Sequence, residues 1–263
     1  MSAHRNHGPE SRRGADWAMV VERWAESSEH SRIGGALMDH VDIPGLVRPG
    51  ERAPPFALPG VAEDGQISLD DYRTKTPLFL ILLRSFECPF CRRQLTRLKE
   101  TAAAFGALGI ETLVVTTTPV KAARLYAKYR PPGIPVASDP DLITHRAYGV
   151  PIYRLSADEA TRWPERLNTG DLSTLLLNPT ADLPESLSIL EAGRALEDAD
   201  GFTAVETEEQ GPPDDVSPLV SFFLIDRAGI VRWLFIEALE NPADYGSYPN
   251  HQELLAAARA MMS

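Results

Sequence analysis

Both cysteines of the 263-residue chain lie in one stretch, Arg84-Ser85-Phe86-Glu87-Cys88-Pro89-Phe90-Cys91-Arg92-Arg93. A CxxC pair can cycle between dithiol and disulfide, or it can supply two thiolates to a metal site. A zinc site needs about four ligands, and the sequence has no third cysteine and no paired ligand spacing at His40 or His145. We interpret the pair as redox-active. A metal site and an inert pair of thiols are the alternatives.

The elements around the pair determine how it is presented. Leu78 to Leu83 form a continuous apolar run, which is typical of a central strand buried on both faces. An amphipathic helix follows from about Pro89, because Leu95, Leu98, Ala102 and Phe105 recur at helical spacing. Proline tolerates the first helical turn, where its missing amide hydrogen would have no intrahelical partner. Cys88 should therefore lie at the helix N-terminus, and it should be more accessible than Cys91.

This placement assigns different roles to the two thiols. Backbone amides and the helix dipole should lower the pKa of Cys88, and Arg92 or Arg93 could add to this, whereas Glu87 opposes it. Cys88 is the predicted nucleophile, and Cys91 is placed to attack a disulfide or sulfenic acid formed on it. The predicted catalytic residues are Cys88, Cys91 and Ser85, and the predicted substrate-binding or thiolate-stabilising residues are Arg84, Pro89, Phe90 and Arg92. Alternatively, Ser85 only ends the strand, and Arg84, Arg92 and Arg93 form a solvated basic rim.

Strand and helix signals alternate along most of the chain. This pattern predicts an α/β fold with a central mixed sheet flanked by helices. Thr118-Pro119 has the form of an N-cap and first helical residue. The expected strands are parts of 50–59 and 66–69, then 78–83, 110–116, 134–137, and a hairpin of 219–225 with 230–236; the expected helices follow Pro89, Pro119 and Asp139 and close the chain at 254–262.

The domain organisation follows from composition. Residues 1–48 are predicted to be a polar tail with a short docking helix from Trp17 to Trp24, and residues 49–263 to be one domain. An acidic insertion, 152–217, interrupts that domain before the C-terminal hairpin. It holds fifteen Asp and Glu residues against four Arg and no Lys. We expect it to be a partly ordered flap, because it is too long for a plain connection.

Composition also limits the partners. The formal net charge of −11 argues against nucleic acid as the main partner. No apolar run approaches the ~20 residues of a membrane helix, and the N-terminal residues lack the apolar stretch of a secretory signal. We expect a cytoplasmic protein. In that reducing compartment a CxxC pair is typically redox-active or metal-binding, and not a permanent structural disulfide.

The chain resembles the thioredoxin-like redoxins, and among them the alkyl hydroperoxide reductase/thiol-specific antioxidant, or peroxiredoxin-like, branch. The resemblance spans about 49–237 without the insertion. It rests on four blocks in order: Gly50 with Pro54, Phe56 and Leu58; the CPFC after an apolar strand; Ser138-Asp139-Pro140-Asp141 leading to Ala147-Tyr148-Gly149-Val150; and FLIDRAGIVRW from Phe223 to Trp233. It implies a thioredoxin-like fold and thiol-dependent chemistry.

Departures from the family pattern bear on mechanism. Peroxiredoxins share a P-x-x-x-T/S-x-x-C loop and a distant Arg that activates the thiolate. Ser85 matches the hydroxyl position, but Ile81 stands at the Pro position and Val220 at the Arg position. Thioredoxins have a cis-Pro facing the CxxC, for which Pro218 and Pro151 are candidates. The chain thus resembles a peroxiredoxin-like body with a thioredoxin-like dithiol.

The expected function is that of a thiol-dependent antioxidant oxidoreductase. A Cys88/Cys91 dithiol–disulfide cycle would reduce disulfides or hydroperoxides, and a thioredoxin-like or low-molecular-weight thiol system would restore it. The alternatives are a dedicated hydroperoxide reductase, a catalytically silent redoxin and a non-catalytic, redox-gated protein that binds a basic partner through the acidic insertion. No metal or organic cofactor is expected, and a homodimer remains open.

Overall fold

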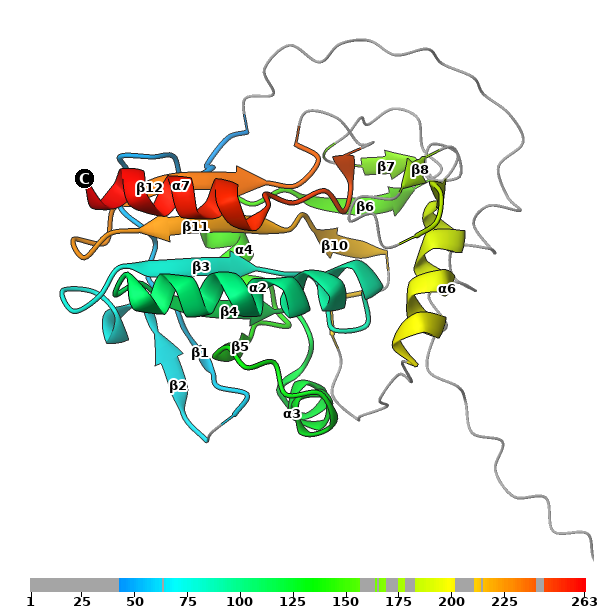
Figure 1. Ribbon diagram of the computed structural model, residues 1–263, viewed down its shortest axis with the longest axis horizontal. Coiled ribbons are helices and arrows are strands. Elements are labelled where there is room, and N and C mark those ends of the chain that lie inside the picture. The colour runs from blue at the N-terminus through cyan, green and yellow to red at the C-terminus, as the bar shows by residue number, and fades with distance from the viewer. Residues whose placement is uncertain are drawn as a thin grey trace, which may run out of the picture.

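The computed structural model has a five-stranded mixed sheet at its centre (Figure 1). It describes residues 43–62, 64–156, 164, 166–168, 175–177, 183–201, 211–213, 215–239 and 244–263. The strand order is β12-β11-β3-β4-β5, with β3, β4 and β5 parallel and β11 antiparallel to both of its neighbours. The strands are β3 (Leu78–Leu82), β4 (Glu111–Thr116), β5 (Val136–Ser138), β11 (Ser221–Ile225) and β12 (Val231–Ile236).

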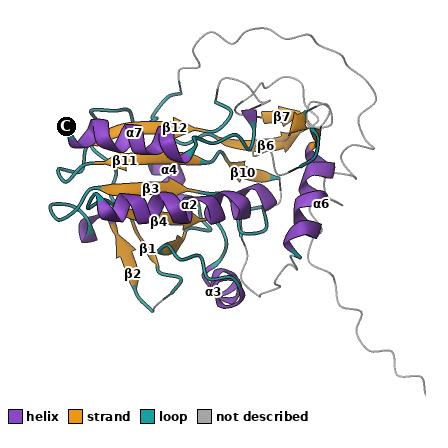
Figure 2. Ribbon diagram, viewed as in Figure 1, coloured by secondary structure: helices purple, strands orange, loops and turns teal. Residues whose placement is uncertain are grey.

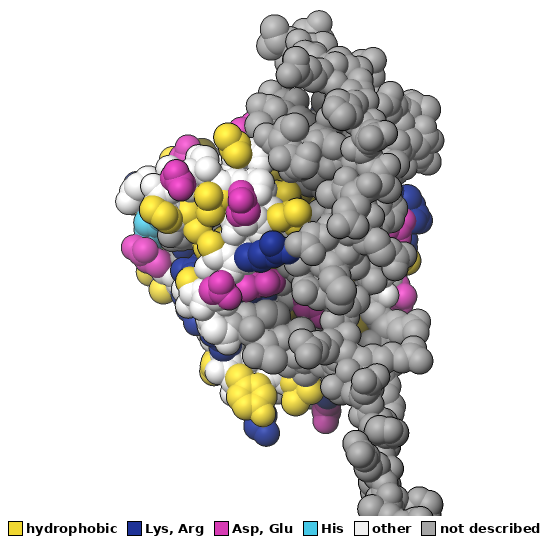
Figure 3. Space-filling view, turned by 90° about the vertical axis from the view of Figure 1, so that its right-hand side faces the viewer, with side chains coloured by type: hydrophobic (Ala, Val, Ile, Leu, Met, Phe, Trp, Pro, Cys, Tyr) yellow, Lys and Arg dark blue, Asp and Glu magenta, His cyan; other side chains and the backbone are white. Residues whose placement is uncertain are grey.

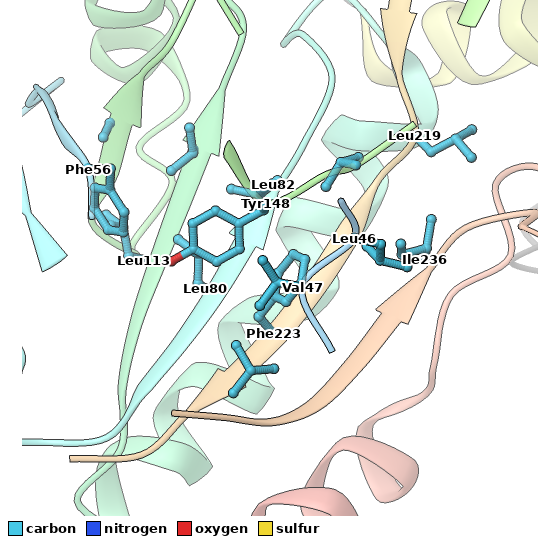
Figure 4. Close-up of a cluster of buried hydrophobic side chains, with 14 of the residues drawn as sticks. Leu46, Val47, Phe56, Leu80, Leu82, Leu113, Tyr148, Leu219, Phe223 and Ile236 are labelled. Carbon is cyan, nitrogen blue, oxygen red and sulfur yellow. The ribbon is translucent and has the colours of Figure 1, made fainter. Parts of the chain in front are cut away.

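Helices cover both faces of this sheet (Figure 2). On one face, Phe79 and Ile81 of β3 pack with side chains of α2 (Pro89–Ala107), α3 (Val120–Tyr129) and α7 (His251–Met262). On the other face, Leu80 and Leu82 pack around Tyr148, which follows α4 (Ile143–Ala147). Figure 4 shows side chains of this second cluster gathered around the Tyr148 ring. Because β3 is covered on both sides, all five of its residues are buried.

Most of the predicted elements are confirmed within one to three residues. The predicted strands near 50–59 and 66–69 are β1 (Ala57–Pro59) and β2 (Gln66–Ser68), which pair antiparallel. One cap differs from the prediction: Pro119, not Thr118, is the N-cap of α3, and its first helical residue is Val120. The Thr118 hydroxyl instead accepts a hydrogen bond from the Phe86 amide at 2.8 Å.

The described parts of the acidic insertion form regular structure. Strand β6 pairs with β7 and β10 in a three-stranded sheet, β8 pairs with β9, and helix α6 packs Ile189, Ala192 and Leu196 into the core. The elements of this region are β6 (Ile152–Ser156), β7 (Arg166–Asn168), β8 (Leu176–Leu177), β9 (Leu187–Ser188), α6 (Ile189–Asp200) and β10 (Val216–Pro218).

The division of the chain into tail, domain and insertion stays a prediction, and the predicted helix at Trp17–Trp24 lies outside the described residues.

A buried carboxylate links α4 to the end of β3. The Asp139 side chain, 1% exposed, accepts hydrogen bonds of 2.8 Å from the amides of Ile143 and Thr144 and contacts His145 Nδ1 at 3.3 Å. The other ring nitrogen of His145 contacts the Leu83 carbonyl at 3.2 Å. Burial raises the pKa of Asp139, but His145 and the two amides lower it more, so the net direction is downward from 3.8. His145 thus has a structural role, since it joins Asp139 to the carbonyl that follows β3.

Asp139→Asn is expected to lower the free energy of unfolding at pH 7 by about 2–3 kcal/mol, because charge-assisted hydrogen bonds are lost in a buried site. The folded pKa of Asp139 lies below the unfolded one, so its stabilisation is present above about pH 5 and is lost as the pH falls through the folded pKa. Urea denaturation at pH 7 and pH 3 should show the difference shrinking in acid. The exposed Asp141→Asn is the control, and an equal loss at both pH values would contradict the assignment.

Candidate active site

The two cysteines lie where the sequence predicts. Cys88 is the N-cap residue of α2 and is partly exposed, whereas Cys91, in the first turn, is fully buried; both are free thiols. Pro89 is the first helical residue, with an extended residue before it. One thiol is therefore accessible at the open end of a helix, and the other lies beneath it.

Hydrogen bonds fix the loop that leads to Cys88. The Thr116 hydroxyl and the Thr117 amide donate to the Arg84 carbonyl at 2.9 and 3.1 Å, and the Cys88 amide donates to the Ser85 carbonyl at 3.2 Å. Together with the Thr118 contact to Phe86, these bonds tie the loop to the segment after β4. Ser85 is partly buried, and its catalytic role remains a prediction.

Arg84 is buried at 3% exposure and surrounded by polar and aromatic partners. Its guanidinium forms a two-pronged ion pair with Glu237, in which Nη1 donates to Oε2 and Nη2 to Oε1, the latter at 3.2 Å. Nη2 also donates to the Tyr248 hydroxyl at 3.2 Å, and the Tyr245 ring stacks 4.2 Å from the guanidinium carbon. Such a fork-shaped pair holds the cation in one orientation.

Sheet register explains why Arg84 meets Glu237. Leu82, Ser221 and Ile236 are adjacent in register on β3, β11 and β12, so β3 and β12 end at the same edge of the sheet. Arg84 and Glu237 follow those ends. Glu237 is fully buried and also accepts hydrogen bonds from the amides of Val220 and Gly246. In the sequence, Arg84 and Glu237 each follow a predominantly apolar run, and this was the available signal. Only the order of the strands in the sheet reveals that the two residues pair.

The electrostatics separate the two thiols. Burial raises the pKa of Cys88, but the Cys91 thiol and amide, together with the charge and hydrogen bond of Arg84, lower it more, from 9.0 to about 5. Burial raises the pKa of Cys91 well above 9.0, and the neighbouring Cys88 sulfur raises it further. Near neutral pH the pair therefore holds a thiolate on Cys88, which is the reactive form of a cysteine, and a proton on Cys91.

Arg92 is used differently from the prediction that it adds to the thiolate's stabilisation. Its Nη1 donates to the carbonyls of Phe86 and Glu87 at 3.0 and 2.7 Å, and its Nε lies 3.3 Å from Asp200 Oδ2 at the end of α6. It is not among the largest influences on the pKa of Cys88. Arg92 thus holds the loop. With 2% exposure for Arg92 and 3% for Arg84, a solvated basic rim is wrong for both residues.

The remaining neighbours of Arg84 are aromatic. Phe90 is buried, and its ring and that of Tyr245 pack edge to face with their centroids 6.2 Å apart. The Tyr245 hydroxyl lies 2.9 Å from the Tyr153 hydroxyl. Tyr153, Tyr245, Tyr248 and Glu237 were missed in the sequence analysis, because the tyrosines lie in segments without clear periodicity.

Among the described residues, no three His, Cys, Asp or Glu side chains form a potential metal site, and no helix could span a membrane.

The acidic insertion contributes charge to the neighbourhood of the site. Asp200 pairs with Arg93 at 2.9 Å in addition to Arg92, and this joins α6 to the first turn of α2. On the face shown in Figure 3, the described side chains carry both signs of charge among hydrophobic groups. At least one insertion carboxylate is therefore engaged within the chain.

Comparisons with known proteins bear on the fold and the family of the chain. Peroxidoxin BcpB from Mycobacterium tuberculosis is similar in structure, with a TM-score of 0.50 and 16% identity over 82% of this chain and 99% of that one. A thiol peroxidase from Chromobacterium violaceum has a lower TM-score of 0.46, with 17% identity over 82% of this chain and 87% of that one. A protein from Chlorobium tepidum, described as the thiol:disulfide interchange protein DsbE, has a TM-score of 0.44, with 21% identity over 81% of this chain and 99% of that one. No curated protein matches the sequence.

The fold is thioredoxin-like, with a mixed sheet flanked by helices. The family model described as AhpC/TSA matches residues 49–234, which is more than two thirds of the chain and includes both cysteines. The chain belongs to the AhpC/TSA family, and its function is a thiol-dependent redox function.

Proposed function

We propose that the protein reduces hydroperoxides through a Cys88/Cys91 dithiol–disulfide cycle. The observation that carries the proposal is the Arg84 guanidinium, which Glu237 holds in place and which stabilises the Cys88 thiolate. A fixed cation beside the nucleophile can also stabilise the negative charge that develops as the peroxide bond breaks. In the peroxiredoxin pattern a distant Arg supplies that cation, and Val220 stands at its position in this chain. Arg84, which follows β3, would supply the cation instead.

The cycle balances with groups on this chain and an external thiol. The Cys88 thiolate attacks the peroxide oxygen, the O–O bond breaks, and Cys88 becomes a sulfenic acid while an alkoxide leaves and takes up a proton. Cys91 then attacks the Cys88 sulfur, forms the disulfide and releases water. Two equivalents of a cellular thiol restore the dithiol. We propose the cytoplasm as the site of action, because the cycle needs such a reductant.

Thiol–disulfide exchange is the second candidate. The accessible Cys88 above a buried Cys91 favours it, because a mixed disulfide on Cys88 would be resolved at once. The pKa of about 5 argues for peroxide as the main oxidant. A stabilised thiolate makes the reduced pair more stable, and such a pair is oxidised readily by peroxide but poorly by the disulfides of a reducing compartment.

Single-turnover oxidation of the reduced protein by hydrogen peroxide tests the proposal. We expect a rate constant at least about a hundredfold above that of a free thiolate, since fixed electrostatic groups contribute on this scale. Cys88→Ser should abolish the reaction, and Cys91→Ser should leave a sulfenic acid on Cys88 that dimedone traps. A wild-type rate no better than that of a free thiolate would overturn peroxide reduction in favour of disulfide exchange.

A further inference from the structure

A cavity of about 340 Å³ lies along helix α2 beside the active-site loop. Its walls come from α2, from the end of α3 with the residues that follow, and from the last residue of α6. The volume lies at the lower end of the range for small-molecule sites. The residues that matter here are Arg92, Lys99, Tyr126, Arg130, Pro131 and Asp200.

The cavity begins at the nucleophile's loop. Cys88, Arg92 and Lys99 are four and seven residues apart, so they follow one face of α2. At 1.5 Å of rise per residue, Arg92 lies ~6 Å and Lys99 ~17 Å along the helix axis from Cys88. The two carbonyls that Arg92 holds belong to the residues just before Cys88. A ligand of peptide size could therefore reach from Cys88 into the cavity.

The charges on the walls favour an anion. Among the lining residues that the structure describes, Asp200 is the one acid, and it pairs with Arg92 and Arg93. Lys99 donates to a neutral acceptor, the Pro131 carbonyl, at 3.0 Å, and Arg130 is exposed at the end of α3. Tyr126 adds a hydroxyl whose pKa burial raises, so it remains a neutral donor. A cationic cavity is notable in a chain whose formal net charge is −11.

We propose that this cavity binds the carboxylates of an anionic, peptide-sized thiol that reduces the Cys88–Cys91 disulfide. The inference rests on the proposed dithiol cycle and names the chemistry of its electron donor. The donor thiolate attacks the Cys88 sulfur, the Cys88–Cys91 bond breaks, and Cys91 takes up a proton. A second donor thiolate attacks the donor sulfur of the mixed disulfide, so the donor leaves as its own disulfide and Cys88 leaves as the thiolate.

Three acetylated, amidated peptide thiols test the charge preference: Cys-Gly-Glu-Glu, Cys-Gly-Gln-Gln and Cys-Gly-Lys-Lys. Each spans about 10 Å beyond its thiol when extended. The rate of reduction of the oxidised protein is divided by the rate of the same peptide with hydroxyethyl disulfide, which corrects for thiol reactivity. We expect the Glu peptide to be about tenfold faster than the Lys peptide at low salt. The overall negative charge alone would give the opposite order.

Variants with equal net charge separate the cavity from the overall field. Arg130→Glu should lower the Glu-to-Gln peptide rate ratio about fivefold or more, whereas Lys128→Glu, two residues earlier in the last turn of α3 and outside the cavity lining, should change it less than twofold. Equal rates for the three peptides, or equal effects of the two variants, would overturn the cavity's role. Those outcomes leave peroxide turnover with a neutral thiol intact, whereas failure of the proposed cycle abolishes turnover with every thiol.

Discussion

Arg84→Gln is expected to raise the pKa of Cys88 and to slow its reactions in acid. The Cys91 thiol and amide, together with the charge and a hydrogen bond of Arg84, lower that pKa to about 5, and a nearby opposite charge typically accounts for about one to three pH units of such a shift. The pH midpoint of Cys88 alkylation by iodoacetamide should move up by that amount. At pH 5 the alkylation rate should fall about fivefold or more, because the thiolate is the reacting form.

Two controls make this result specific. Arg93→Gln removes a cation from α2, the helix that Cys88 caps. Arg93 pairs with Asp200 and is not among the largest influences on the pKa of Cys88. It should leave the alkylation midpoint within about half a pH unit. Arg84→Lys keeps the charge without the planar fork and should fall between wild type and Arg84→Gln. An unchanged midpoint in Arg84→Gln would show that the helix terminus and Cys91 stabilise the thiolate without the arginine.

The local parts of this site could be predicted because their determinants are local. The apolar run before Arg84 and the helical spacing after Pro89 place Cys88 at a strand-to-helix junction, and the structure confirms both elements. The hairpin was equally clear, since two apolar runs flank a glycine-containing turn. The net shift of the Cys88 pKa did not follow from the sequence, because Glu87 opposes the helix terminus, and the raised pKa of Cys91 was not predicted; the structure lowers the first and raises the second.

The long-range parts could not be predicted from patterns along the chain. Arg84 and Glu237 are 153 residues apart, and their contact depends on the order of β3, β11 and β12 in the sheet. Thr118 fits a helix cap in sequence, but the Phe86 amide competes for its hydroxyl. Arg92 is next to the cysteines in sequence, yet the carbonyls of the loop and Asp200 engage its guanidinium. In each case a distant partner decided which local option was realised.

Glu237→Gln is expected to lower the free energy of unfolding by about 3–5 kcal/mol. Removal of the carboxylate leaves the Arg84 cation buried without its counter-charge, and this is the costly way to break a buried pair. The amide can still accept from Val220 or Gly246, but it cannot reproduce the two-pronged ion pair. Urea denaturation of the reduced protein, followed by far-ultraviolet circular dichroism, measures the loss.

The double variant Arg84→Leu/Glu237→Leu separates stability from reactivity. With both charges gone, no uncompensated ion remains, so the double variant should be more stable than Glu237→Gln by about 1–3 kcal/mol. It should nevertheless keep the raised Cys88 alkylation midpoint of Arg84→Gln, because the cation beside the thiolate is missing. A double variant with a wild-type midpoint would contradict the role of Arg84. If both predictions hold, the pair persists because Cys88 needs the cation, and Glu237 makes that cation tolerable in the core.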